Sequence, residues 1–301
     1  MKRILAVLLV LSIIFAFSAC SGKENGEETT TVENGFEVAQ STSAEATSAN
    51  GEASSEAESE TISETAESTT AAAEKMPETM EEVIAKYKEV MDQAKQKDKP
   101  GFTRLDYQEL LSDPENRVIG SGEGLINAAL TLAGNFMKTK KEAEKKPTIG
   151  EKGGDMEALP LRGTTHGCLL NGTKGVRSAK CEKLNNGYYK ITIVLEAEKN
   201  PEPTAPGTDV APSITGSVCS PISKAEIDAD LATGLFKDIT YSLTYHDCET
   251  VLIYNPENNH IYSQEQTNRV TIKGAGTIGF VTLDIQKQEL INHVVIKDLK
   301  Y

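Results

Sequence analysis

The sequence lacks the motifs that identify several large classes of protein. It contains no Gly-x-Ser-x-Gly nucleophile elbow and no complete phosphate-binding loop. The stretch Gly120-Ser-Gly-Glu-Gly124 precedes a helical pattern, but it has no lysine and carries an acid that would repel phosphate, so we interpret it as a loop and helix start. No stripe of basic residues with interleaved aromatics occurs, so we expect no nucleic-acid partner. These absences predict no catalytic residues, no metal and no cofactor.

One fragment does match a nucleotide-binding pattern. Gly274-Ala-Gly276-Thr-Ile-Gly279 has the GxGxxG spacing of dinucleotide-binding loops. That chemistry needs a helix N-terminus directly after the loop, so that backbone N–H groups can bind a pyrophosphate. The next residues alternate as a strand does, so we interpret Gly274–Gly276 as a glycine-rich hairpin turn.

Long hydrophobic runs are also scarce. The longest, Ile4–Phe17, has about fourteen residues, whereas a helix that spans a membrane needs about twenty. The run follows Lys2 and Arg3 and ends in small residues before Cys20. This pattern predicts that residues 1–20 are a signal peptide rather than part of the fold.

The segment Phe17-Ser-Ala-Cys20 resembles the lipobox of bacterial lipoproteins, with Phe17 where that family usually has leucine. The resemblance implies cleavage before Cys20, lipidation of Cys20 with palmitate-like chains, and anchoring at the extracytoplasmic face of a cell membrane. Two or three acyl chains, at about 0.8 kcal/mol per buried methylene, anchor firmly where one short chain would be marginal. The alternatives are a signal peptide cut elsewhere and an uncleaved anchor helix.

Residues 21–77 have almost no apolar side chains and consist mainly of Ser, Thr, Glu, Ala and Gly. Such a segment cannot bury enough surface to offset the entropy of ordering, so we expect a disordered linker. It contains thirteen glutamates and two lysines, and therefore carries most of the chain's net charge of −14. The acidity belongs mainly to the linker, which we interpret as a spacer between membrane and domain.

The first part of the expected domain, residues 78–146 of 78–301, has helical periodicity. Apolar residues from Met80 to Ala94 recur at intervals of three and four, and Pro100 ends the pattern. We predict a shorter helix at Leu105–Leu111 and a longer helix over 124–145. Residues 146–160 are predicted to form an exposed connection.

From residue 160 to 301 the period changes to two, which is typical of half-buried strands. Alternating segments cover 188–196, 239–246, 251–254, 261–273, 277–286 and 290–296. Asn186-Gly187 and the segment 255–259 are turn signals between them, and Ser223 with Glu226 predicts a capped short helix. The sequence therefore predicts an α+β domain, with N-terminal helices packed on one face of a twisted antiparallel sheet of about six to eight strands.

This order of elements, over about 78–301, looks like the open half-barrel of lipoprotein carriers. The resemblance implies an apolar ligand held between sheet and helix. A cystatin-like arrangement of a helix on a sheet fits the same order. The helices expected before the first strand depart from the half-barrel pattern.

Four cysteines besides Cys20 lie in the expected domain: Cys168, Cys181, Cys219 and Cys248. An even number outside the cytoplasm favours two disulfides, with three possible connectivities. In one of them Cys168 faces Cys181 across a hairpin, which leaves Cys219 to pair with Cys248. The alternative is a Cys2His2 zinc site, because His166 and His246 each precede a cysteine by two residues. We interpret the four histidines as packed or surface residues.

Tyrosines are concentrated in the predicted strands, and their apolar rings with polar tips suit either a recognition surface or half-exposed strands. They are Tyr188, Tyr189, Tyr241, Tyr245, Tyr254 and Tyr262. The sequence thus predicts a lipid-anchored protein of the bacterial envelope without catalysis. Its expected partner is a lipid or other apolar ligand. The alternative is an interaction protein that binds another envelope protein or a wall polymer.

Overall fold

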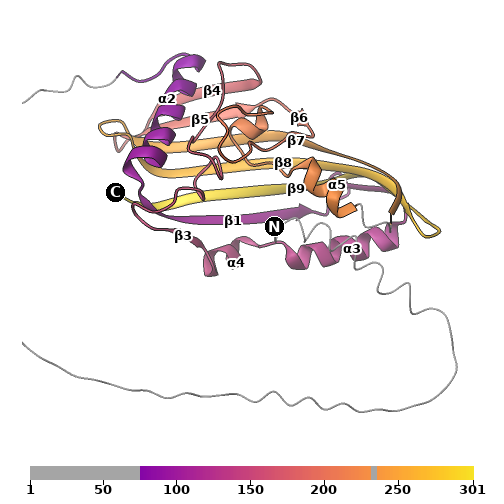
Figure 1. The fold of residues 1–301 in the computed structure, drawn as a ribbon. Coiled ribbons are helices and arrows are strands. Elements are labelled where there is room, and N and C mark those ends of the chain that lie inside the picture. Colours follow the sequence, from indigo (N-terminus) through magenta and orange to yellow (C-terminus); the bar gives the residue numbers. More distant parts are fainter. Residues whose placement is uncertain (1–74, 232–235) are drawn as a thin grey trace, which may run out of the picture. The chain divides into compact units, whose positions relative to one another are not determined.

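The computed structural model describes residues 75–231 and 236–301 (Figure 1), so the predicted signal peptide, Cys20 and nearly all of the linker lie outside it. The described residues form an α+β fold with one open antiparallel sheet, as predicted. Seven strands follow one another in the order β3-β1-β9-β8-β7-β5-β4, while β2 pairs with β9 and β6 with β7.

The sheet is built mainly from three long strands that form consecutive hairpins, β7, β8 and β9. The strand bounds are β1 Gly101–Leu111, β2 Arg117–Ser121, β3 Thr148–Gly150, β4 Val176–Lys183, β5 Tyr189–Leu195, β6 Glu198–Lys199, β7 Phe236–Asn255, β8 His260–Ile278 and β9 Val281–Lys300. The helices are α2 Met80–Gln93, α3 Glu123–Phe136, α4 Lys140–Lys145 and α5 Lys224–Leu231, with a π-helical turn at Ala94–Asp98 and a 3-10 turn at Thr215–Ser217.

Helix α2 confirms the predicted helical face and supplies much of the main core. Thr79 and Glu82 form a capping box at its start, which satisfies backbone N–H groups that have no partner inside the helix. Its buried face packs on apolar side chains of β5 and β7. Tyr87 also brings its hydroxyl within 3.0 Å of Thr250 Oγ1, and Gln264 donates to that same oxygen at 3.1 Å. This buried polar contact fixes how α2 sits on the sheet.

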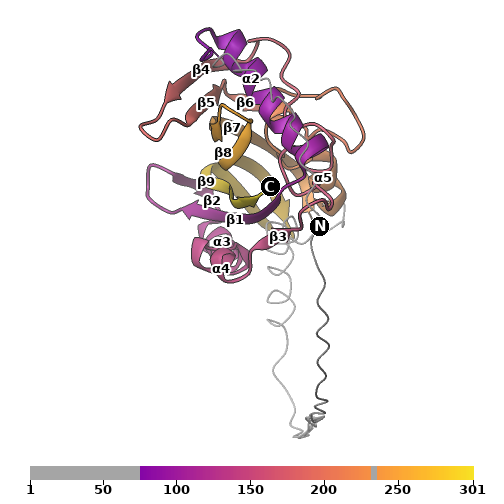
Figure 2. The ribbon, with the colours of Figure 1, turned by 90° about the vertical axis from the view of Figure 1, so that its left-hand side faces the viewer.

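The helices lie on both sides of the sheet. Figure 2 shows the strands curving around the side that carries α2 and α5, which we call the concave face. Helix α4 packs on the opposite, convex face, where Ala143 meets Leu105 and Tyr107 of β1. The prediction that all N-terminal helices cover one face is therefore wrong for α4.

Two of the predicted helices differ from the structure. Residues 105–111 belong to β1, because their backbone pairs with β9 from Leu105↔Val295 to Leu111↔Glu289. The single helix expected over 124–145 is divided into α3 and α4. Thr139 separates them, since its side chain accepts from Glu142 N and starts a new capping box.

The strand boundaries also differ from the prediction. Segments 239–246 and 251–254 are parts of one strand, β7, whose alternation is interrupted by a bulge between His246 and Glu249. Strand β8 continues through the predicted turn at Gly274–Gly276, and the chain reverses at Gly279 and Phe280 instead. The turns at Asn186-Gly187 and 255–259 are confirmed.

The connection from β3 to β4 is packed against the sheet and not simply exposed. Leu159 and Leu161 are each 1% exposed. Lys95, 4% exposed in the π-helical turn that follows α2, donates hydrogen bonds to their carbonyl oxygens at 3.1 and 2.6 Å. This buried amine therefore joins the connection to the helix, and burial lowers its pKa to about 8.

Candidate functional site

A cavity of about 140 Å³ lies on the concave face between α5 and the strands β7, β8 and β9. Its walls are almost entirely aliphatic, and the aliphatic side chains that line it are Ile222, Ile227, Leu231, Ile239, Leu243, Val270, Ile272, Leu283, Ile285 and Leu290. An enclosed cavity of about 150 Å³ with such walls binds benzene, whereas this one is partly open to solvent. Its volume matches one ring or a short stretch of acyl chain.

Two glycines of β8 make room for this cavity. Gly274 and Gly276 alternate with Ala275, so both face the same side of the sheet as Ile272. A Cβ atom on Gly274 would lie 3.5 Å from the nearest atom, the carbonyl oxygen of Thr240, and one on Gly276 would have 3.4 Å of clearance. A Cβ atom is therefore sterically allowed at both positions, and both glycines line the cavity.

Helix α5 is held over the cavity by polar contacts at its rim. Glu202 accepts hydrogen bonds from Ser223 Oγ and Lys224 N, and so caps the helix. The expected capping box of Ser223 with Glu226 is not formed. At the next turn Tyr241 donates to Asp228 Oδ1 at 2.6 Å. Hydrogen bonds from Lys224 and Tyr241 lower the pKa of Asp228, so this carboxylate stays ionised.

The strands that line the cavity end in an exposed apolar tip. Phe280 is fully exposed in the β8–β9 turn, and Val281 beside it is 43% exposed. Ile278 and Leu283, on the two strands just before and after the turn, are buried against Ile126 of α3. Apolar side chains thus continue from the exposed tip of the hairpin toward the cavity, with Ile278 and Leu283 covered by α3.

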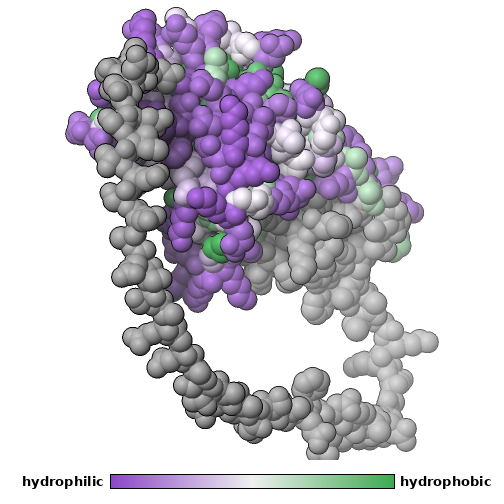
Figure 3. Space-filling view, turned by 60° about the vertical axis from the view of Figure 1, so that its left-hand side comes forward, coloured by the Kyte–Doolittle hydropathy of each residue, from purple (hydrophilic) through white to green (hydrophobic). Residues whose placement is uncertain are grey.

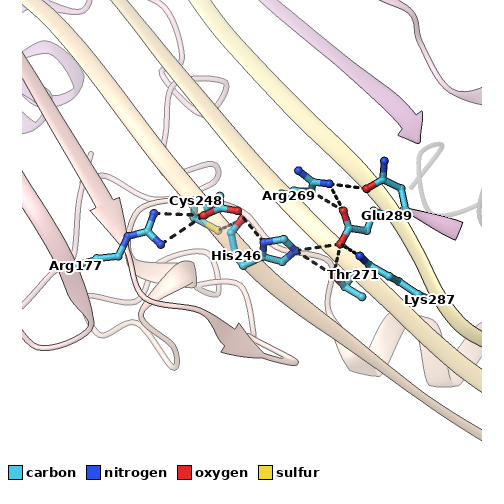
Figure 4. Close-up of polar contacts among 9 residues, drawn as sticks. Arg177, His246, Cys248, Arg269, Thr271, Lys287 and Glu289 are labelled. Atoms are coloured by element: carbon cyan, nitrogen blue, oxygen red, sulfur yellow. Dashed lines mark hydrogen bonds and ion pairs between the residues drawn. The ribbon is translucent and has the colours of Figure 1, made fainter. Parts of the chain in front are cut away.

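A second group of interacting side chains lies on the convex face (Figure 4). Arg269 and Thr271 of β8 and Glu289 of β9 alternate with the core residues Val270 and Leu290, so they face the opposite side. We call these three, with His246, Lys287 and Asn116, the convex polar cluster. No local sequence pattern indicates this cluster, because the register of three strands brings its members together.

Glu289 is the centre of the convex polar cluster, with a side chain that is 4% exposed. Arg269 forms an ion pair with it, Lys287 Nζ lies 3.1 Å from its Oε1, and Thr271 Oγ1 donates to that oxygen at 3.1 Å. Burial alone would raise the pKa of Glu289, but these hydrogen bonds and the Arg269 charge outweigh it and hold the pKa below its usual value. The buried carboxylate is therefore ionised, and the charges of Arg269 and Lys287 compensate its own.

His246 extends the convex polar cluster toward solvent. Its Nδ1 lies 2.9 Å from Asp247 Oδ2, and its Nε2 lies 3.0 Å from Thr271 Oγ1. An Asp–His–hydroxyl chain is the arrangement that activates a nucleophile in hydrolases. Here the hydroxyl of Thr271 is buried and donates to Glu289, while the backbone around it is paired on both sides in the sheet. The geometry favours a polar connection between β7, β8 and β9.

The four cysteines are thiols in the structure, and no two lie at disulfide distance. Cys181 has Ile191 as its cross-strand partner, and Cys168 lies outside the strands. Cys168, Cys219 and Cys248 are instead buried in the main core, close to α2. Burial raises the pKa of Cys168 and of Cys248 to about 12. The two disulfides stay a prediction.

The histidines of the alternative zinc site contact different groups. His166 lies 3.1 Å from Asp209 and 3.4 Å from Asp92, whereas His246 belongs to the convex polar cluster. Within residues 75–231 and 236–301, no group of three or more His, Cys, Asp or Glu side chains has an arrangement that could hold a metal ion.

The tyrosines of the predicted strands divide into two sets. Tyr189, Tyr245 and Tyr254 fill the main core, where the rings of Tyr189 and Tyr254 meet edge to face at 5.9 Å. Tyr188, Tyr241 and Tyr262 lie outside it, Tyr241 beside α5 and the other two at the end of the sheet that carries the β7–β8 turn. Three of the six tyrosines are therefore core residues and not part of a recognition surface.

Comparison of the chain with protein-family models, with curated proteins and with solved structures gives no significant match. In the part of the chain that the structure describes, no helix has the length and apolar character needed to cross a membrane.

Proposed function

We propose that this chain is a membrane-anchored binding protein whose concave cavity holds an apolar ligand. The observation that carries the proposal is the cavity itself, an aliphatic space of about 140 Å³ that remains open between α5 and the sheet. The aliphatic walls of this partly open space lack the contacts that a well-packed interior would give them. An apolar ligand would recover those contacts.

The size of the cavity limits the ligand. About six buried methylenes, at about 0.8 kcal/mol each, would contribute about 5 kcal/mol. The cavity would thus take one ring or the end of one acyl chain, while the remainder of a larger lipid would lie outside it. Phe280 and Val281 at the tip of the hairpin offer an apolar surface beside which that remainder could lie.

The lipobox at Cys20 supports the same proposal. Lipidation would keep the domain near a membrane, which is the main source of acyl chains in a bacterial envelope. The convex polar cluster, in contrast, connects neighbouring strands and is assigned a structural role in the proposed protein.

Calorimetric titration of the purified full chain with octanoate and with octane-saturated buffer tests the proposal. We expect saturable binding by the parent chain and none by Gly274→Leu, whose added side chain would occupy the cavity. The matched control is Ser242→Val, a change on the other face of β7 that should leave binding intact. Equal binding by the parent and Gly274→Leu would contradict the proposal.

A further inference from the structure

A groove of about 500 Å³ lies at the other end of the sheet, where the β7–β8 turn meets the end of β9. Figure 3 shows this side of the molecule, on which hydrophilic residues predominate. The groove is lined by aromatic rings, two asparagines and one charge of each sign. No residue that lines the proposed apolar site also lines this groove.

The groove exists because β8 and β9 separate at this end. Their pairing runs from Ile278↔Val281 to Gln264↔Ile296 and stops there. Beyond that point β8 pairs with β7 alone, and β9 pairs with β1 alone. Both strands also carry an irregularity beside the groove, at Tyr262 in β8 and at Asp298 in β9. Bulges of this kind re-aim side chains and are common next to functional sites.

Aromatic rings form one wall of the groove. The ring of Tyr262, whose residue is 62% exposed, meets Tyr188 edge to face at 5.7 Å, so much of its surface remains open to solvent. His260 and Tyr301 stack at 3.7 Å with nearly parallel planes. An exposed tyrosine held in place by a neighbouring ring is a flat apolar platform with a polar edge.

Hydrogen-bonding groups accompany the rings. Asn255 and Asn258 use their side-chain oxygens to accept from backbone N–H groups of the turn, which leaves their amide N–H groups as donors. Lys297 and Asp298 line the same groove, and no described residue forms an ion pair with either. Asp298 also has a φ of 56°, an unfavourable backbone conformation that the fold maintains at this point.

These features favour a sugar chain over a peptide or an acidic polymer. The faces of pyranose rings carry C–H groups that pack on aromatic rings, while their rims carry hydroxyls that need both donors and acceptors. The charges of Lys297 and Asp298 cancel, so the groove has no preference for a strongly charged ligand. An added peptide strand would need the backbone N–H of Ile261, and that group already donates to Tyr301 Oη.

We infer that this groove is a carbohydrate-binding site for a neutral polysaccharide of pyranose rings, with Tyr262 as the stacking platform. In a protein tethered by Cys20 such a site would bind the domain to a glycan of the cell surface. This inference is independent of the apolar cavity, because the two sites use different residues at opposite ends of the sheet.

The inference is tested by retention of the purified full chain on chitin, cellulose and isolated peptidoglycan, followed by titration with N-acetylglucosamine and glucose hexamers. We expect at least one polysaccharide to retain the chain. Tyr262→Ala should weaken binding of the matching hexamer about tenfold or more, whereas Tyr262→Phe, which keeps the ring, should stay within about threefold of the parent.

The controls separate loss of a site from loss of the fold. Ile149→Ala removes an apolar side chain of similar exposure in β3 and should bind as the parent does. Tyr262→Ala should keep the parent's thermal midpoint, because the ring is exposed. Failure of all three polysaccharides, or equal binding by Tyr262→Ala, would overturn the inference, as would retention of an extended peptide in place of sugar.

Discussion

Lys95 shows how one buried amine can connect a helix to a long loop. Its two hydrogen bonds to Leu159 and Leu161 replace the water that the charged group loses, but only in part, since burial lowers its pKa to about 8. The unfolded chain keeps this lysine charged up to its ordinary pKa near 10.5. Folding therefore releases a proton between these two pH values.

From this difference we predict that Lys95 makes the chain more stable as the pH rises from about 8 to about 10.5, by about 3 kcal/mol in total. Buried thiols such as Cys168 lower the stability as the pH rises above 9. The pH dependence of the parent must therefore be compared with that of Lys95→Met, which retains these thiols. Urea unfolding of both proteins at several pH values measures it. A constant difference between the two free energies of unfolding would contradict the prediction.

Glu289 is the residue on which the convex polar cluster depends. Glu289→Gln leaves Arg269 and Lys287 facing each other without a counter-charge, and we expect a loss of about 2 kcal/mol at pH 7 because both cations are only partly buried. The folded-state pKa of Glu289 is lowered, so its stabilisation is present above about pH 4.5 and is lost as the pH falls through the folded value.

Urea unfolding at pH 7 and pH 3 tests this dependence. The difference between the parent and Glu289→Gln should shrink at pH 3. Glu265→Gln is the control, since Glu265 lies in β8 on the same face of the sheet as Glu289 but is exposed. If Glu265→Gln were as destabilising as Glu289→Gln, the effect would be one of total charge and not of this cluster.

At the scale of elements, α5 is a short helix whose position depends on a few polar contacts. Asp228 contacts both Lys224 and Tyr241, and it is the only link from the middle of α5 to β7 among the hydrogen bonds of the described residues. We predict that Asp228→Ala speeds amide hydrogen exchange in 224–231 about tenfold. Exchange in α2 should not change, and an equal increase there would indicate general destabilisation instead.

The sequence predicted local elements better than distant pairings. The periodicity of α2 is complete within fourteen residues, and the structure confirms it. Residues 105–111 fit a helix or a strand equally well by spacing alone. They form a strand because their backbone pairs with β9, which lies about 180 residues further along the chain. No local pattern contains that information.

The candidate sites were harder to predict for related reasons. The cavity is formed where side chains are missing, and Gly274 and Gly276 predicted a turn because glycine is most common there. In the convex polar cluster, His246 and Glu289 become neighbours only through the register of β7, β8 and β9. A one-residue shift of either pairing would place them on opposite faces.

At the scale of the whole molecule, we propose a lipid anchor joined to a domain with two separate binding sites. The anchor is predicted from the lipobox, so Cys20→Ser should abolish labelling by palmitate and release the chain from the membrane fraction. Cys181→Ser removes a half-buried thiol of the domain and should change neither result. Membrane retention of unlabelled Cys20→Ser would instead favour an uncleaved anchor helix.

The central claim is that the concave cavity holds an apolar ligand, and native mass spectrometry of the full chain purified from its membrane tests it most directly. We expect a population that carries one added apolar molecule, released on denaturation, and absent from Gly274→Leu. A parent chain that is always empty, or a Gly274→Leu variant that carries the same molecule, would contradict the account.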